Sequence, residues 1–189
     1  MVQRTLSVAS CGRRLGTREE GRRFAESVNS TLAALPPAGL LVVDLARIEV
    51  LGGSFADEAI GEPLARMTAG DHPDRYLLLR SPSVEILEDL DLKLRARRLA
   101  MLAGVGQRVH WRILGSLAPF LQESLGWLLT REMGTSQDLA AGLGVSSEAA
   151  AVRLRRLARQ RLAHLVPESL PGGGVRYQAI SLPSLAKTP

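Results

Sequence analysis

Five arginines lie within nine residues near the end of this chain, and they are its strongest candidates for chemistry: Arg153, Arg155, Arg156, Arg159 and Arg161. A guanidinium group presents N–H donors in a fixed fork that matches phosphate oxygens and base edges. From Leu117 to the end the chain has eight Lys or Arg and five Asp or Glu, so the positive charge is concentrated on one segment. This distribution favours a nucleic acid as partner, with a solvated helix face as the simpler alternative.

The other residues that could do chemistry do not form a recognisable site. His72, His110 and His164 stand on separate segments without helical spacing, and Cys11 is the single cysteine. This excludes an internal disulfide and gives no zinc-binding pattern. The neighbours Asp57 and Glu58 would point about 100° apart on a helix and would not converge on one substrate. We therefore expect a protein that is not an enzyme and that has no metal or cofactor.

The elements that would position the arginines form a helix-turn-helix pattern. Residues Thr135 to Ser146 predict a capped short helix, a turn that contains glycine, and a second serine cap. A further helix is expected over Ser147 to Gln160, with Ala150, Leu154 and Leu157 on its buried face. The side chains expected to face outward into a major groove are Ser147, Glu148, Val152, Arg153 and Arg156, while Arg155 and Arg159 are better placed for phosphates.

Two further elements are expected around this motif. Leucines recur at helical spacing from Leu117 to Met133, which predicts a helix that Gly134 stops. Residues 162–166 and 175–180 are expected to form a hairpin around Pro171-Gly172-Gly173-Gly174. Arg176, near the tip of this hairpin, could reach the DNA backbone or the minor groove.

The segment Leu139-Ala140-Ala141-Gly142-Leu143-Gly144-Val145-Ser146 resembles the "Leu-Ala-x-x-Leu-Gly-Val-Ser" segment of MarR- and ArsR-type bacterial repressors. The likeness covers residues 117 to 182. It implies a winged helix-turn-helix DNA-binding domain, which we place at residues 117–189, and double-stranded DNA as the partner. Arg161 is one departure, since such domains often have glycine there, before the strand of the wing.

The first half of the chain alternates strand-like and helix-like segments. Strands are expected at residues 4–8, 40–45, 76–79 and 108–114, and helices at 17–35, 55–67 and 83–102. Gly115-Ser116 marks a boundary. The predicted fold class is an α/β domain over residues 1–114, with helices on one face of a sheet, followed by a mostly α domain.

The segment Ser54-Phe55-Ala56-Asp57-Glu58, after the apolar run 40–45, resembles STAS-like domains, in particular a bacterial group with a "Ser-Phe-Ala-Asp-Glu" motif. In the related antagonists of anti-sigma factors, a partner kinase phosphorylates a serine at this junction, and Ser54 aligns with it. Here Gly52-Gly53-Ser54-Phe55 replaces their Asp-Ser-Ser-Gly sequence, and Asp57 and Glu58 would oppose a nearby phosphate. We interpret Ser54 first as a helix N-cap and second as a regulatory site together with Asp57 and Glu58.

These observations predict a cytoplasmic, bacterial-type transcriptional regulator whose first domain senses a partner or ligand. The alternative is a partner-switching adaptor, in which the surface around Ser54 binds a kinase-like ATPase or another regulator and the winged helix contacts proteins. No stretch approaches the roughly 18 apolar residues of a membrane span, so no membrane partner is expected. A homodimer is an expected arrangement, because two-fold dimers are common among such DNA-binding proteins.

Overall fold

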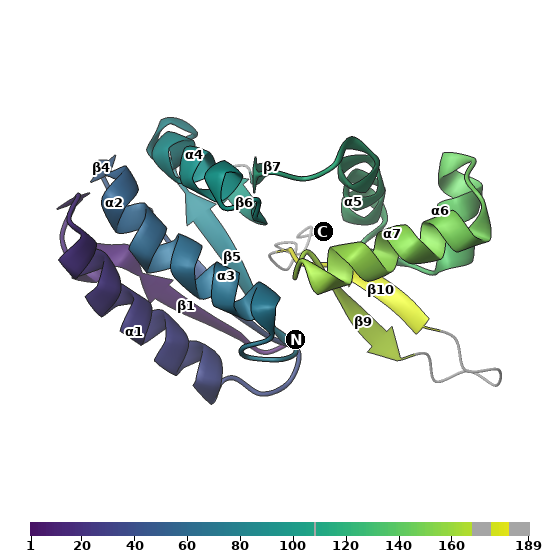
Figure 1. Ribbon diagram of the computed structural model, residues 1–189, viewed down its shortest axis with the longest axis horizontal. Coiled ribbons are helices and arrows are strands. Elements are labelled where there is room, and N and C mark those ends of the chain that lie inside the picture. Colours follow the sequence, from purple (N-terminus) through teal and green to yellow (C-terminus); the bar gives the residue numbers. More distant parts are fainter. Residues whose placement is uncertain (108, 168–174, 182–189) are drawn as a thin grey trace, which may run out of the picture.

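The computed structural model describes residues 1–107, 109–167 and 175–181 (Figure 1). Its N-terminal region, residues 1–115, is built on a five-stranded sheet with the strand order β1-β3-β5-β6-β7. The first four strands of this sheet are parallel, and β7 is antiparallel to β6. The strands are β1 (Gln3–Ser7), β3 (Gly39–Asp44), β5 (Arg75–Ser81), β6 (Ala100–Val105) and β7 (His110–Gly115). The fold is therefore mixed α/β, as the sequence predicted.

The helices that connect the parallel strands lie on one face of this sheet (Figure 1). Because the strand order advances in a single direction and such crossovers are right-handed, each connection places its helix on the same side. The opposite face is left for another part of the chain. The helices are α1 (Arg18–Ala34), α2 (Gly53–Ala56), α3 (Glu62–Ala69) and α4 (Glu88–Ala96), with short turns η1 (Val8–Ser10) and η3 (Glu85–Leu87) and a small parallel sheet of β2 (Arg14–Leu15) and β4 (Val50–Leu51).

Helix α1 begins and ends close to the predicted residues. The Thr17 hydroxyl accepts a hydrogen bond from the Glu20 backbone N–H, and the Glu20 carboxylate accepts one from the Thr17 N–H, which is the predicted capping signature. Phe24, Val28 and Leu32 are buried on the face that packs against the sheet. Local capping and periodicity are thus sufficient to define this helix.

Helices α2 and α3 are joined by a π-helical turn, η2 (Asp57–Gly61), where one α-helix over 55–67 was predicted. The Glu62 N–H donates to the Asp57 carbonyl, one residue further back than in an α-helix. Pro63 has no N–H, and in a regular α-helix its ring collides with the carbonyl four residues earlier, so a wider turn relieves the contact. The predicted apolar face is confirmed as buried: Phe55, Ala59, Ile60 and Leu64.

The prediction of a helix over 83–102 is wrong beyond Ala96, because Ala100–Val105 forms strand β6 between β5 and β7. The chain reverses at Arg98, which has a left-handed φ of 57°, and the Leu99 N–H donates to the Leu94 carbonyl. Strand β6 is buried along its whole length, so no polar alternation marks it as a strand. Its Ala, Met and Leu residues also have high intrinsic helix propensity.

The C-terminal region, residues 117–181, contains three described helices and an antiparallel sheet with the order β8-β10-β9. The first helix ends at Arg131 rather than at Met133, because Glu132 adopts a left-handed φ of 66°; Gly134, predicted to stop the helix, lies in a strand. The predicted tip Pro171–Gly174 and residues 182–189 lie outside the described residues. The elements are α5 (Pro119–Arg131), β8 (Met133–Gly134), α6 (Ser136–Leu143), α7 (Ser147–Arg159), β9 (Ala163–Pro167) and β10 (Val175–Ala179).

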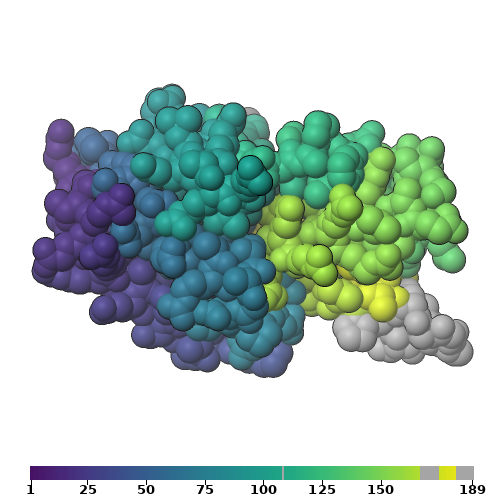
Figure 2. Space-filling view, in the orientation of Figure 1, coloured from purple at the N-terminus to yellow at the C-terminus, as the bar shows by residue number. Residues whose placement is uncertain are grey.

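The C-terminal region covers the sheet face that carries no helix of the N-terminal region, and Figure 2 shows the two regions in direct contact. In addition, the Arg161 guanidinium donates to the Met67 carbonyl near the end of α3. None of the described helices is long and apolar enough to cross a membrane. One buried apolar cluster joins the sheet residues Leu40, Val42, Tyr76, Leu78, Ala100 and Leu102 to the core of the C-terminal region, including Leu117, Leu121, Leu125, Leu154 and Leu162. The sequence did not predict this shared core.

Candidate nucleic-acid interface

Helices α6 and α7 are joined by a short turn whose caps were predicted from the sequence and are confirmed. Helix α6 begins with a capping box, in which the Asp138 N–H donates to the Thr135 hydroxyl and the Thr135 N–H donates to the Asp138 carboxylate at 2.8 Å. Gly144 ends α6 in the left-handed conformation, and the Ser146 hydroxyl accepts the Ala149 N–H to begin α7. The backbone and side-chain hydrogen bonds of Thr135 hold the pKa of the Asp138 carboxyl below its usual value.

Helix α7 packs on the rest of the C-terminal region through Ala150, Leu154 and Leu157, all of which are fully buried, as predicted. With 3.6 residues per turn, the side of the helix opposite these three residues carries residues 148, 152, 155, 156 and 159. All five of those side chains are exposed. Three of them are arginines, so the outward side of α7 is basic.

The predicted contact residues of α7 differ in how they are held. Arg153 does not face outward as predicted: it lies on the side that faces α5, where its guanidinium donates to the Glu123 carboxylate at 2.9 Å and its side chain is only 17% exposed. Within the described part of the chain, no carboxylate lies within ion-pair distance of Arg155, Arg156 or Arg159. The predicted residues Ser147, Glu148 and Val152 are exposed. The basic side of α7 is therefore open to an external anion, while Arg153 is held in place by α5.

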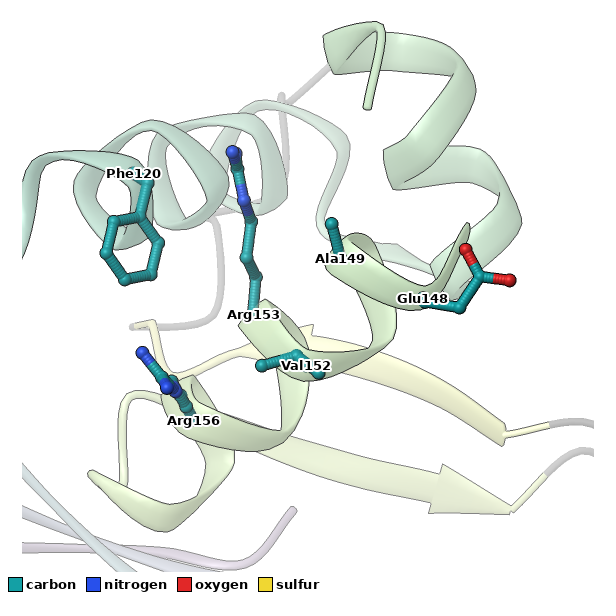
Figure 3. A pocket seen from close by; sticks show the side chains of 6 residues that line it. All are labelled: Phe120, Glu148, Ala149, Val152, Arg153 and Arg156. Atoms are coloured by element: carbon teal, nitrogen blue, oxygen red, sulfur yellow. The ribbon is translucent and has the colours of Figure 1, made fainter. Parts of the chain in front are cut away.

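A depression of about 400 Å³ lies between α7 and the start of α5 (Figure 3). Phe120, from the first turn of α5, faces the helix, and the guanidinium groups of Arg153 and Arg156 lie 5.6 Å and 5.8 Å from the centre of its ring. The lining residues are Phe120, Glu148, Ala149, Val152, Arg153 and Arg156. Sequence reasoning missed Phe120; the available signal was an aromatic residue directly beside the leucine stripe of α5.

Two further arginines lie at the edges of this region. Arg176 lies in β10 opposite Val166 of β9, and its charge contributes, after the hydrogen bonds from Thr135, to lowering the pKa of Asp138. Arg161 adopts a left-handed φ of 61° at the position where glycine was expected. Its side chain donates to the Met67 carbonyl, so the residue that departs from the pattern connects the two regions.

The prediction that Ser54 caps a helix is wrong. Gly52 is the N-cap of α2, Ser54 lies inside its first turn, and no side chain of this segment caps the helix. Instead the Gly53 N–H donates to the Asp89 carboxylate of α4 at 2.9 Å. A capping group supplied by α4, distant in sequence, replaces the local one.

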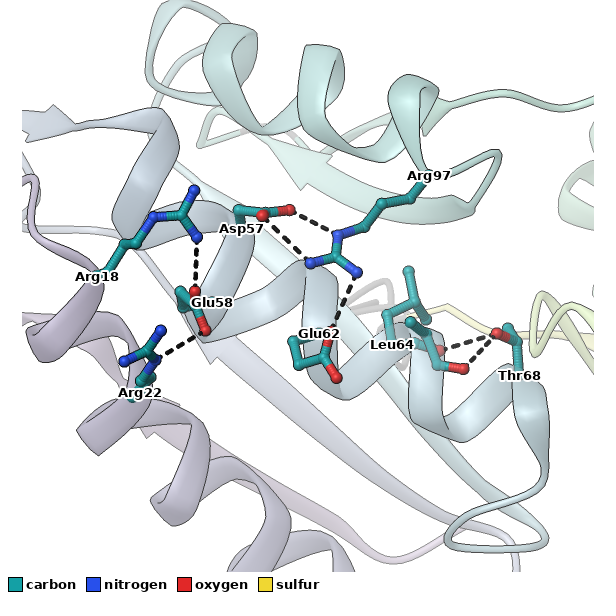
Figure 4. Close-up of polar contacts among 9 residues, drawn as sticks. Arg18, Arg22, Asp57, Glu58, Glu62, Leu64, Thr68 and Arg97 are labelled. Carbon is teal, nitrogen blue, oxygen red and sulfur yellow. Dashed lines mark hydrogen bonds and ion pairs between the residues drawn. The ribbon is translucent and has the colours of Figure 1, made fainter.

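The predicted regulatory carboxylates are engaged in ion pairs that join the helices of the N-terminal region (Figure 4). Asp57 accepts from the Arg97 guanidinium at 2.6 Å, and this hydrogen bond lowers the pKa of the Asp57 carboxyl. Glu58 accepts from Arg18 at 2.7 Å and from Arg22 at 3.3 Å, and the bond from Arg18 lowers its pKa most. Both carboxylates therefore serve contacts between helices.

Among residues 1–107, 109–167 and 175–181, no group of three or more His, Cys, Asp or Glu side chains is arranged to hold a metal ion. Cys11 is an exposed free thiol. No protein-family model matches the chain, and no curated protein matches it in sequence.

Proposed function

We propose that this protein is a DNA-binding transcriptional regulator whose C-terminal region is a winged helix-turn-helix domain and whose helix α7 docks in the major groove. The observation that carries the proposal is the outward side of α7, where Arg155, Arg156 and Arg159 are exposed without a carboxylate partner among the described residues. Arginines in this state are suited to phosphate oxygens and base edges.

The dimensions of α7 support the same proposal. Its 13 residues make a helix of about 20 Å, and the major groove of B-DNA, about 12 Å wide, admits such a helix. The capped turn and helix α6 fix the start of α7, and the buried Leu154 and Leu157 fix its rotation. The basic side therefore keeps one orientation, which a recognition helix requires.

We assign the N-terminal region to a STAS-like domain that receives a regulatory signal. Its sheet shares one apolar cluster with the C-terminal region, and Arg161 bonds to α3, so the helix face of this region and α7 belong to one packed unit. A partner or ligand on the N-terminal region would therefore act on the orientation or access of α7 and not through a loose linker.

The partner-switching adaptor has less support. A phosphate on Ser54 would meet the carboxylate of Asp89, which already accepts the Gly53 N–H at the start of α2. A helix N-terminus attracts an anion because its N–H groups lack partners, and here one of them is bonded to another anion. The geometry around Ser54 therefore favours an unmodified serine.

The test of DNA binding is fluorescence anisotropy of the full chain with labelled genomic duplexes across a salt series. We expect affinity to fall as salt rises, because phosphate neutralisation releases counterions. In the double variant Arg155→Ala plus Arg159→Ala, the plot of log K against log salt should become shallower by about 2, since each lost phosphate contact removes about 0.9 from the magnitude of the slope.

The matched control is Arg22→Ala plus Arg23→Ala, which removes two exposed charges from α1, and its slope should equal that of the unmodified protein. Equal losses in the two double variants would mean that only net charge matters. Absence of salt-dependent binding to every genomic duplex at low salt would refute the proposed function.

A further inference from the structure

Two large apolar side chains, one from α5 and one from α7, are exposed beside the arginines of α7. Phe120 is 36% exposed and Val152 is 39% exposed, and both line the depression together with the half-buried Ala149 (Figure 3). Phosphate oxygens offer no favourable contact to these three side chains. A ligand that fills the depression therefore needs an apolar group as well as polar groups that match the charged lining residues Arg156 and Glu148.

The arginines around the depression are oriented by its apolar floor. Arg153 is held by the Glu123 carboxylate and by the ring of Phe120, and Arg156 lies over the same ring while remaining exposed. A guanidinium stacked on an aromatic ring keeps a fixed plane with its N–H donors at the edge. The site thus combines a floor of Phe120, Ala149 and Val152 with a charged rim of Arg153, Arg156 and Glu148, of which Arg153 is already paired with Glu123.

In the major groove of DNA the 5-methyl group of thymine is the one apolar feature among the base edges. The remaining edges present hydrogen-bond donors and acceptors. Over the part of the depression formed by Phe120, Ala149 and Val152 they would lose their water without gaining a partner, and they are suited instead to the charged lining residues Glu148 and Arg156. A thymine methyl, by contrast, is covered by the apolar side chains, while neighbouring phosphates are within the reach expected for the exposed arginines of α7, among them Arg156.

We infer that Phe120, Ala149 and Val152 form a contact site for the methyl group of one thymine, and that Phe120 is a specificity-determining residue although it lies outside the helix-turn-helix. The inference rests on the proposed function and deepens it, because it names the base that the surface selects. Sequence preference then depends on α5 as well as on α7.

The experiment starts with a duplex that the full chain selects from a random-sequence pool, with its bound segment mapped by footprinting. Each thymine in the footprint is replaced in turn by deoxyuridine, which removes only the methyl group. We expect one position to lose affinity about fourfold, the factor that corresponds to burying one methyl group. Thymines outside the footprint should be replaceable without effect.

The variants Phe120→Ala and Val152→Ala test whether these two side chains cause the difference in affinity between the thymine duplex and the deoxyuridine duplex. Each should bind the thymine duplex and the deoxyuridine duplex with nearly equal affinity. Leu92→Ala is the matched control, because it truncates an apolar side chain that is 63% exposed on α4, in the N-terminal region. This control should retain the fourfold preference for the thymine duplex.

A selected site without thymine, or a deoxyuridine effect of the same size in both variants and the unmodified protein, would overturn the inference and leave DNA binding intact. If no duplex shows salt-dependent binding, the proposed function and the inference fail together. A fourfold effect that disappears in Phe120→Ala but remains in Leu92→Ala supports the inference directly.

Discussion

The N-terminal and C-terminal regions use arginine in two different ways. Residues 1–116 contain 16 Lys or Arg and 14 Asp or Glu, and most ion pairs of the described chain lie there. In the C-terminal region one described pair, Arg153–Glu123, stands beside the exposed Arg155, Arg156 and Arg159, which have no carboxylate partner among the described residues. The partners of a charge in space, more than its density along the sequence, separate structural arginines from those available to a ligand.

The largest expected effect is a loss of stability on truncating the core that the two regions share, and it tests whether these regions unfold together or separately. Leu78 is fully buried on the sheet face shared by both regions. We expect Leu78→Ala to lower the free energy of unfolding by about 3 kcal/mol. Urea unfolding should remain a single transition when followed by far-UV circular dichroism and by the fluorescence of Trp111 and Trp127, which pack on this cluster.

The control for this experiment is Leu79→Ala on the opposite face, where the side chain is equally buried among the helices. Its cost should be similar and its transition also single. Two separated transitions in Leu78→Ala but not in Leu79→Ala would show that the regions fold independently and that their contact is weak.

The next largest effect is expected from replacing one arginine in each region, Arg97 in an ion pair and Arg155 on the exposed side of α7. Arg97→Ala removes the partner of Asp57, whose side chain is 14% exposed, and should cost about 2 kcal/mol, as expected when a hydrogen bond to a partly buried charge is lost. Arg155→Ala should change stability by less than about 0.5 kcal/mol but weaken DNA binding. Chemical denaturation measures the stability of both variants, and fluorescence anisotropy measures their DNA binding. A large loss of stability in Arg155→Ala, together with weaker DNA binding in Arg97→Ala, would reverse the two roles.

The shared core should also make stability depend on pH. His164 is buried beside the ring of Tyr76, 5.6 Å away, and burial lowers its pKa below the usual 6.5, although the charge of Asp74 opposes this shift. The unfolded chain therefore binds this proton first as pH falls. The contribution of His164 to the free energy of unfolding should be fully present well above pH 6.5, the usual pKa of histidine. It should decrease as the pH falls below that value, by at most about 1.4 kcal/mol per pH unit.

Urea titrations at pH 7.5, 6.5 and 5.5 measure this decrease. His164→Phe keeps an aromatic ring against Tyr76 but cannot be protonated, so its stability should vary less over the same range. An identical pH profile for the variant and the unmodified protein would assign the effect to other groups.

The smallest effect compares two serines that both looked like helix caps in the sequence. Ser146→Ala should cost about 1 kcal/mol, because the hydroxyl accepts the Ala149 N–H at the start of α7. Ser54→Ala should change stability by less than about 0.5 kcal/mol, because Ser54 caps no helix. Thermal unfolding of the two single variants is sufficient; an equal loss in both would contradict the position of Ser54 inside α2.

The parts of the fold that the sequence predicted correctly depend on nearby residues. The capping boxes at Thr17 and Thr135 and the left-handed Gly144 are local signals, and the apolar spacing of α1 and α7 is a local period. The mostly buried strand β3 was recognisable because branched apolar residues fill it. Such features can be inferred before the chain is folded because each is set within about four residues.

The parts that were missed depend on contacts across the sequence. Strand β6 consists of helix-favouring residues and becomes a strand only between β5 and β7. The cap of α2 comes from Asp89, and the outward direction predicted for Arg153 is changed by Glu123, 30 residues away. No local pattern contains these partners, so the candidate site could be located from the sequence but its geometry could not.

The single direction of the strand order also has a consequence for synthesis of the chain. The sheet is complete at Gly115, but the face that contains Leu40, Val42 and Leu78 is covered only by residues that follow it. At about 5–20 residues per second, the ribosome needs roughly 3–13 s to make the next 65 or so residues. During that interval the nascent sheet exposes one apolar face to water, so a ribosome stall after Gly115 would leave a fragment prone to capture by chaperones or to aggregation.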